Sequence, residues 1–239
     1  MTRMIGLLRD EHRDIEQLLK VLEHELKVFD RRERPDYEVI QAIIDYFQDY
    51  PDCCHHPKED MIFDKLRARN PSAAKRIGDV EAEHRQETER LDRVAKVVRN
   101  ILLDREISRE TFSTVMRDFI DHQRVHMAME EHSMFPAAAN ALRPQDWQEI
   151  DSKWNDKTET LFNVAMEEKC HSLRDRILRW GRENNENRIV DRHKQAQPMR
   201  TTTISAHYRR LAAAALVRRL TTALAFPPHP TGKKRQECR

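Results

Sequence analysis

The sequence predicts an all-α fold, and its composition and its apolar spacing are the two observations behind that prediction. Only four of the 239 residues are glycine and 35% are charged, and long straight-chain residues lose little rotamer freedom in a helix. Apolar residues recur at alternating intervals of three and four, the spacing of a helix buried along one face. Four such stretches joined by short polar loops predict an up-down-up-down four-helix bundle, with an additional C-terminal helix and a basic, disordered extension after it.

The first two predicted helices span residues 5–29 and 40–66. In the first helix, the apolar seam is interrupted at one position, which holds His12. Pro35 ends this helix, and Asp36 caps the next one. Two prolines should bend or restart the second helix in its middle, namely Pro51 and Pro57.

The third predicted helix covers residues 70–101 and carries His84 on its buried seam. Ser108 should cap the fourth helix, because its hydroxyl can accept a hydrogen bond from the first turn. A fifth helix over residues 144–180 can cover one end or one side of the bundle. The seam of the fourth helix includes two histidines, His122 and His126.

The chain is expected to divide into a bundle over residues 1–180 and a basic, low-order C-terminal extension over residues 181–239. Thirteen of the 43 Lys and Arg residues, but only four of the 41 Asp and Glu residues, fall in the extension. The bundle is therefore acidic, which gives no electrostatic reason to expect nucleic-acid binding there.

No apolar run approaches the roughly 20 residues of a membrane span, so no membrane partner is expected. The N-terminus lacks the pattern of an export signal, and the four cysteines suggest no disulfide framework. These features predict a soluble, cytoplasmic protein.

Each of the four bundle helices places a histidine on its buried seam. Four unpaired imidazoles in one small core would each cost free energy unless a partner satisfied them. Two glutamates, Glu59 and Glu130, follow histidines by one helical turn and so lie on the same face. A metal centre would satisfy all of these groups at once. The four seam positions are His12, His55 or His56, His84 and His126.

The number and type of these side chains indicate which metal to expect. They exceed what one tetrahedral ion needs, which favours two ions that share bridging carboxylates. Nitrogen and oxygen donors without a thiolate suit iron, manganese, zinc or cobalt. A nitrogen-rich set without a phosphate-binding loop favours iron and oxygen chemistry over phosphoryl transfer.

The segment YPDCCHHPKED, residues 50–60, contains two alternative pairs of candidate metal ligands. His55 precedes Glu59 by four residues, and His56 precedes Asp60 by the same interval. We prefer His55, because its position continues the apolar stripe of the second helix. A zinc site within this segment is disfavoured. Cys53 and Cys54 are adjacent and lack the two-residue gap that lets two thiolates reach one ion.

These motifs together resemble the hemerythrin-like, or HHE cation-binding, domain over about residues 1–140. That resemblance implies a four-helix bundle that holds a non-haem centre of two iron ions, with Glu59 and Glu130 as bridges. The motifs are L-x-x-E-H ending at His12, H-H-P-K-E-D-x-x-F from His55, E-x-E-H ending at His84, and H-M-x-M-E-E-x-x-M-F-P from His126. The residues that match ligand positions are His12, His55, Glu59, His84, His126 and Glu130.

The sequence departs from respiratory hemerythrins, which carry a further histidine one turn from the third-helix ligand. Val80 and Thr88 occupy those positions here, and the fourth helix carries H-x-x-x-E in place of H-x-x-x-x-D. His122, one turn before His126, is the candidate for a compensating ligand or a hydrogen bond to one. It is also the candidate catalytic acid–base group.

The resemblance implies that the di-iron centre binds dioxygen or a related small molecule, in sensing, storage or detoxification. One alternative is a di-iron peroxidase or catalase-like enzyme acting on hydrogen peroxide. Another is a metal-free helical interaction module. A ferritin-like di-iron set is a further alternative, because two E-x-x-H motifs occur, at Glu81–His84 and Glu168–His171.

Overall fold

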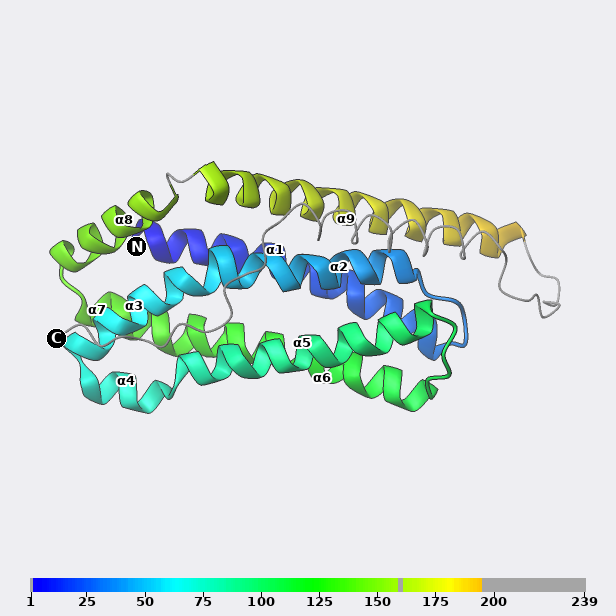
Figure 1. Ribbon diagram of the computed structural model, residues 1–239, viewed down its shortest axis with the longest axis horizontal. Coiled ribbons are helices and arrows are strands. Elements are labelled where there is room, and N and C mark those ends of the chain that lie inside the picture. Colours follow the sequence, from blue (N-terminus) through cyan, green and yellow to red (C-terminus); the bar gives the residue numbers. More distant parts are fainter. Residues whose placement is uncertain (1, 159–160, 195–239) are drawn as a thin grey trace, which may run out of the picture. The chain divides into compact units, whose positions relative to one another are not determined.

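The computed structural model describes residues 2–158 and 161–194, and nearly all of these residues are helical. The four segments of the bundle are α1 (Arg3–Asp30), α2 (Tyr37–Tyr50) with its continuation α3 (His56–Arg69), α5 (Val80–Leu102), and α6 (Arg109–Met129) with its continuation α7 (Phe135–Ala141). Consecutive segments run in opposite directions, and α1 packs against α2 and α6 while α5 packs against the same two helices (Figure 1). The predicted all-α bundle is confirmed.

Two helix starts follow the predicted capping. The side chain of Asp36 accepts hydrogen bonds from the backbone N–H groups of Glu38 and Val39, at 3.0 and 3.1 Å. Ser108 Oγ accepts one from the N–H of Thr111 at 3.0 Å. Each cap satisfies backbone donors that have no partner within the first helical turn.

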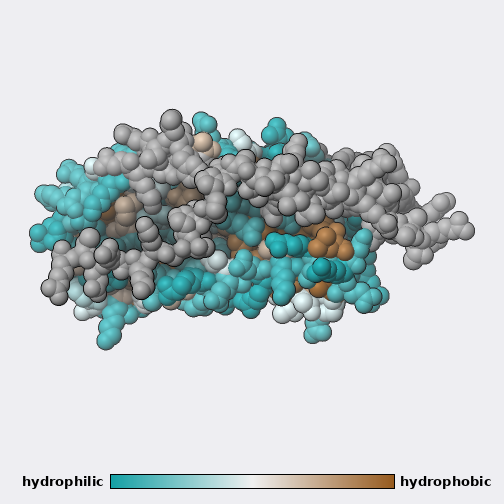
Figure 2. Space-filling model, viewed as in Figure 1, coloured by the Kyte–Doolittle hydropathy of each residue, from teal (hydrophilic) through white to brown (hydrophobic). Residues whose placement is uncertain are grey.

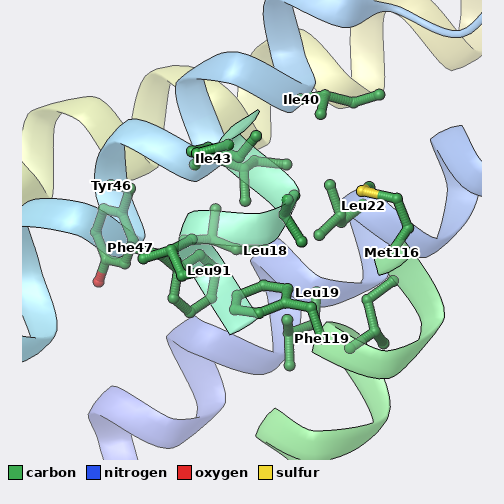
Figure 3. Close-up of a cluster of buried hydrophobic side chains, with 14 of the residues drawn as sticks. Leu18, Leu19, Leu22, Ile40, Ile43, Tyr46, Phe47, Leu91, Met116 and Phe119 are labelled. Atoms are coloured by element: carbon green, nitrogen blue, oxygen red, sulfur yellow. The ribbon is translucent and has the colours of Figure 1, made fainter. Parts of the chain in front are cut away.

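The larger hydrophobic core lies at the end of the bundle where α1 joins α2. Side chains from all four segments meet there, so each apolar stripe is buried against the other three (Figure 3). A second apolar cluster lies at the opposite end, around α3 and α7. The labelled core residues are Leu18, Leu19, Leu22, Ile40, Ile43, Tyr46, Phe47, Leu91, Met116 and Phe119.

Two short π-helical segments interrupt the bundle helices between these clusters. They are η1 (Pro51–His55), between α2 and α3, and η2 (Glu130–Met134), between α6 and α7. A proline follows each segment by two residues, Pro57 and Pro136. Because a proline ring clashes with the carbonyl four residues before it, a wider turn at that point relieves the clash. The predicted break in the second helix takes this form, whereas the break after Met129 was not anticipated.

The third predicted helix is divided in two, so the expectation of one continuous helix over residues 70–101 was wrong. α4 (Pro71–Ile77) ends at Gly78, which has a φ of +105°. This backbone conformation is open to glycine and strained for other residues. Asp79 then caps α5 by accepting a hydrogen bond from the N–H of Ala82 at 3.0 Å.

The region of the fifth predicted helix also contains two helices, α8 (Pro144–Thr158) and α9 (Leu161–Lys194). α9 packs on α1 and α2 and continues through Gly181, where the sequence suggested that the bundle ends. A Cβ atom at Gly181 would lie 3.2 Å from both methyl groups of Val21 on α1. The glycine therefore allows α9 to approach α1 closely.

The described part of the chain ends with α9 at Lys194, so the helical region continues past the boundary expected at 180. The remainder of the expected basic extension, residues 195–239, lies outside the described residues. Among the described helices, none has the combination of length and apolar character needed to cross a membrane. On the face drawn in Figure 2, the described surface is mainly hydrophilic, with smaller apolar areas.

Candidate metal centre

The six predicted ligand residues meet in the middle of the bundle. His12 comes from α1, His84 from α5 and His126 from α6, while the remaining three lie at the π-helical interruptions or directly after one. His55 is the last residue of η1, Glu59 lies in the first turn of α3, and Glu130 is the first residue of η2. All six are buried, and none is more than 8% exposed: His12, His55, Glu59, His84, His126 and Glu130.

These residues form two sets that share the two glutamates. One set adds His12 and His55 to Glu59 and Glu130, and the other adds His84 and His126. Within each set, one potential ligand atom from every residue lies within 4.8 Å of the others. We call the first set the α1–η1 position and the second set the α5–α6 position.

At the α1–η1 position, the carboxylate oxygens face the Nε2 atoms of both histidines. Glu59 Oε1 lies 3.4 Å from His12 Nε2 and 3.3 Å from His55 Nε2. Glu130 Oε2 lies 3.4 Å from His12 Nε2. Ligand atoms bound about 2.1 Å from one ion lie about 3 Å apart when they are neighbours, so these separations suit a shared ion.

At the α5–α6 position, the same two glutamates present their other oxygens. Glu59 Oε2 lies 3.5 Å from His84 Nε2. Glu130 Oε1 lies 3.1 Å from His126 Nε2 and 3.9 Å from His84 Nε2. Each glutamate thus offers one oxygen to each histidine pair, which is the arrangement of a carboxylate that bridges two ions.

Many of the buried polar atoms at the centre have no hydrogen-bond partner. A buried polar group left without one costs about 1–3 kcal/mol, so such a concentration calls for a physical explanation. A cation between the carboxylates and the imidazoles would satisfy all of these atoms together. The buried atoms without a hydrogen-bond partner include Nε2 of His12, His84 and His126, and both carboxylate oxygens of Glu59 and Glu130.

Protons replace the cation in the metal-free protein. Burial alone would lower the pKa of His12, but the adjacent Glu130 and Glu59 carboxylates raise it to about 10. Burial would also lower the pKa values of the other three histidines, but nearby carboxylates raise each of them to about 9: Glu59 and Glu11 for His55, and Glu130 and Glu59 for His84 and His126. Burial and the charge of Glu59 would raise the pKa of Glu130, yet the histidines lower it to about 2. A bound metal would therefore displace protons from these rings.

A second layer of side chains fixes the two histidines of the α1–η1 position. The Nδ1 atom of His55 lies 2.7 Å from Glu11 Oε2, and that of His12 lies 3.0 Å from Glu131 Oε1. The fully buried Lys58 donates to Glu11, and its ammonium lies 4.7 Å from the centre of the Trp154 ring. A carboxylate on the far nitrogen fixes the tautomer and the orientation of a metal-binding histidine.

Sequence reasoning missed Glu11 and Lys58 as functional residues. Both letters occur in the motifs, but they lie beside the apolar seam, where a charged residue is expected to be solvated. Glu87 was missed as well: it is 4% exposed, with Oε1 3.6 Å from His126 Nε2. Its spacing of three residues after His84 and four before Leu91 was an available signal, because that spacing places it on the seam.

The alternates His56 and Asp60 belong to neither set. His56 Nε2 lies 3.2 Å from Glu87 Oε2, and the ring stacks on His84 with centroids 3.9 Å apart. Asp60 is partly exposed, and its carboxylate lies 3.5 Å from His84 Nδ1, on the side of the ring away from the glutamates. These positions favour His55 and Glu59 as the inward-facing pair.

His122 also lies outside both sets. Its ring stacks beside that of His126 with centroids 6.4 Å apart, and its Nε2 atom has no hydrogen-bond partner. Burial and the nearby Arg90 guanidinium lower its pKa, so the ring is neutral at physiological pH. It neighbours a proposed ligand and does not reach the glutamates.

The thiols and the ferritin-like set are not part of this centre. Cys53 Sγ and Cys54 Sγ lie 2.6 Å apart, and hydrogen bonding with Cys170 raises the pKa of the Cys53 thiol. Raised pKa values keep such thiols protonated, which disfavours metal binding by thiolate. In the ferritin-like alternative, Glu81 and His171 are exposed to solvent and do not converge on the buried core.

Comparison with known proteins points to one family. The sequence matches the hemerythrin HHE cation binding domain over residues 3–138, which is more than half of the chain. No curated protein and no solved structure matches it significantly.

Proposed function

Because the chain belongs to the hemerythrin HHE cation-binding domain family, we propose that its two histidine pairs and two shared glutamates hold a non-haem di-iron centre. This proposal rests on one observation: the two oxygens of each carboxylate face different metal positions. Glu59 and Glu130 each place one oxygen 3.1–3.5 Å from an imidazole nitrogen on either side. One ion would leave half of these atoms without a partner.

The donor set fits iron. Imidazole and carboxylate donors without a thiolate suit iron, manganese, zinc or cobalt, and four imidazoles give a nitrogen-rich site. When bound, a pair of iron ions supplies one-electron chemistry towards oxygen that zinc does not. The cytoplasmic location and the count of two ions remain predictions.

The proposed activity is the binding of dioxygen or a related small molecule, in sensing, storage or detoxification. The chain contributes burial and orientation to this activity. Phe135, which is fully buried, stacks on the ring of His12 with centroids 5.6 Å apart. Glu11 and Glu131 hold the rings of the α1–η1 position in place from behind. Such hydrogen bonds keep the imidazole nitrogens directed at the metal position while a small molecule binds there and leaves.

Elemental analysis combined with absorption spectroscopy tests the proposal. Protein loaded with iron and purified in air should hold about two irons per chain and show near-ultraviolet charge-transfer bands of ferric iron. Glu59→Gln should lose both, because it weakens a bridge to both positions. A matched variant, Glu16→Gln, changes a glutamate paired with Arg124 at the surface of α1 and should lose neither. A chain that holds one ion, or zinc alone after growth in iron, would contradict the proposal.

Peroxide turnover is the second candidate, and His122 is the observation that favours it. Breaking down a peroxide needs a group that moves protons between oxygens. His122 is neutral and has an unpaired Nε2 beside His126. Oxygen evolution from hydrogen peroxide that is lost in His122→Phe at unchanged iron content would support the enzyme. No turnover, with a spectral change on exposure to oxygen, would support binding.

A further inference from the structure

The two metal positions differ in how they are enclosed. At the α1–η1 position, carboxylates hold the outer nitrogens of both histidines, and Phe135 stacks on the ring of His12. At the α5–α6 position, Nδ1 of His126 has no hydrogen-bond partner. The buried Glu87 Oε1 has none either, although it lies 3.6 Å from His126 Nε2. The second position therefore has fewer hydrogen bonds that hold its ligand side chains in place.

A cavity of about 160 Å³ adjoins the α5–α6 position. It lies between α2, η1, α5 and α6, and its inner wall includes His56 and Glu87. Thr88 and Asp92 are exposed and form part of its mouth. A cavity of this volume has room for a molecule of several heavy atoms, and it is lined by residues from three of the four bundle segments.

Two side chains separate the cavity from the proposed ligands. The His56 ring stacks on His84 at 3.9 Å, so one face of His56 lies against the α5–α6 position. Glu87 bonds to His56 through Oε2 at 3.2 Å and directs Oε1 towards His126. Glu87 therefore lies between the cavity and the α5–α6 position.

We propose that small exogenous molecules reach the centre from this side, through the cavity behind His56 and Glu87, and bind at the α5–α6 position. This inference rests on the proposed function, because it assumes a metal ion at that position. Glu87 Oε1 is available to accept a hydrogen bond from an O–H or N–H group. The acidic pair Glu87 and Asp92 disfavours anions along this route, so it should admit small uncharged molecules more readily than small anions.

Blocking the mouth of the cavity tests the route. The probes are nitric oxide with the reduced, iron-loaded protein and azide with the oxidised one, both followed by stopped-flow absorption. Thr88→Trp places an indole at the mouth and should slow the association of both probes about tenfold or more, with the iron content unchanged. Glu89→Trp places the same ring at the next exposed position of α5, outside the cavity, and should keep wild-type rates.

A second substitution tests the charge of the route. Glu87→Gln keeps the shape of the side chain and removes its charge, so azide should bind about tenfold more tightly while the rate with nitric oxide changes less than twofold. Glu81→Gln, at an exposed position of the same helix, should change neither. Loss of iron in Glu87→Gln would make Glu87 a ligand and overturn its assignment to the wall of the cavity.

The two proposals can fail separately. If Thr88→Trp and a second mouth variant, Asp92→Trp, both keep full iron and wild-type rates, the access route is overturned and the di-iron centre stands. If the wild-type chain holds no iron, the proposed function fails and this inference fails with it.

Discussion

The Nδ1 atom of His55 lies 2.7 Å from the carboxylate of Glu11, although 44 residues separate the two in the chain. Glu11 in turn receives the ammonium of Lys58, which is fully buried. The ring of His55 is therefore held from its outer side while its Nε2 atom faces Glu59 at 3.3 Å. Three residues from α1, η1 and α3 thus form one chain of contacts that ends at the proposed metal position.

Glu11→Ala should weaken metal binding without abolishing the fold. Removing the carboxylate frees the ring of His55 to rotate, and loss of such a partner typically costs 10- to 100-fold in metal affinity, to order of magnitude. Competition with a chelator of known affinity measures the effect. Glu16→Ala, on the same helix and paired with a surface arginine, should change affinity less than twofold. Equal effects of the two substitutions would show that Glu11 does not position His55.

Lys58→Met should destabilise the protein by up to roughly 3–5 kcal/mol, because it removes one of the two cations, Lys58 and protonated His55, that face the buried Glu11 carboxylate. Urea unfolding of the metal-free protein measures this change. The double variant Glu11→Gln with Lys58→Met removes both charges and should recover a large part of the loss. Recovery of none of it would mean that Lys58 acts through packing against Trp154 and not through Glu11.

His55→Ala should lose at least one of the two metal ions, whereas His56→Ala should keep both. The difference is expected because His55 Nε2 faces Glu59, while His56 faces Glu87 at 3.2 Å. Metal content per chain after identical loading is the measurement. The opposite pattern would mean that the segment after η1 turns by one residue when metal binds.

The stability of the metal-free protein should fall as pH rises from about 7 to 10. The folded pKa values of the four histidines, about 9 to 10, lie above the ordinary 6.5, so the folded chain binds protons that the unfolded chain releases. This stabilisation is complete below about pH 6.5 and is lost as pH rises through the folded values. One pKa unit corresponds to about 1.4 kcal/mol, so a fall of at least about 2 kcal/mol is expected.

Urea unfolding at a series of pH values measures this dependence. The metal-loaded protein is the control, because its imidazoles have already exchanged protons for metal and should show a much smaller change between pH 7 and 10. A free energy of unfolding that is flat or rises over this range in the metal-free protein would contradict the protonated state of the histidines.

His122→Phe should leave metal content unchanged. The ring of His122 lies 6.4 Å from that of His126 and reaches neither glutamate. Iron analysis of the variant and of His126→Phe gives the contrast, since the second substitution removes a proposed ligand. Loss of iron in both would make His122 a ligand that moves inward when metal binds.

The seam histidines could be predicted because burial of a helical stripe follows directly from apolar spacing. An imidazole at position 12 or 84 lies where the stripe requires a buried residue, whatever the partner helices are. Lys58 could not be predicted in this way. Its burial depends on how α3 packs beneath α8, which places Trp154 over it, and that packing is a property of the assembled chain.

Local signals were also misjudged where they depend on packing. A glycine at position 181 in a polar stretch is typical of a helix end, yet α9 continues through it. The glycine instead serves the packing of α9, because Val21 on the neighbouring α1 leaves little space there for a side chain. Gly78 behaves in the opposite way: it ends a helix within a stretch whose apolar spacing predicts a continuous one, because it adopts a positive φ. In both cases, the three-dimensional surroundings decide which property of glycine is used.

The two π-helical segments make the centre sensitive to chain length. Each holds one residue more than an α-helical turn needs, and one residue corresponds to about 100° of rotation in an α-helix. Deleting a single residue from η1, such as Cys53, would favour continuous α-helix and turn either the α2 stripe or the pair His55 and Glu59 away from the core. A one-codon deletion could therefore leave a well-folded bundle that has lost its metal, and an insertion at the same place could restore it.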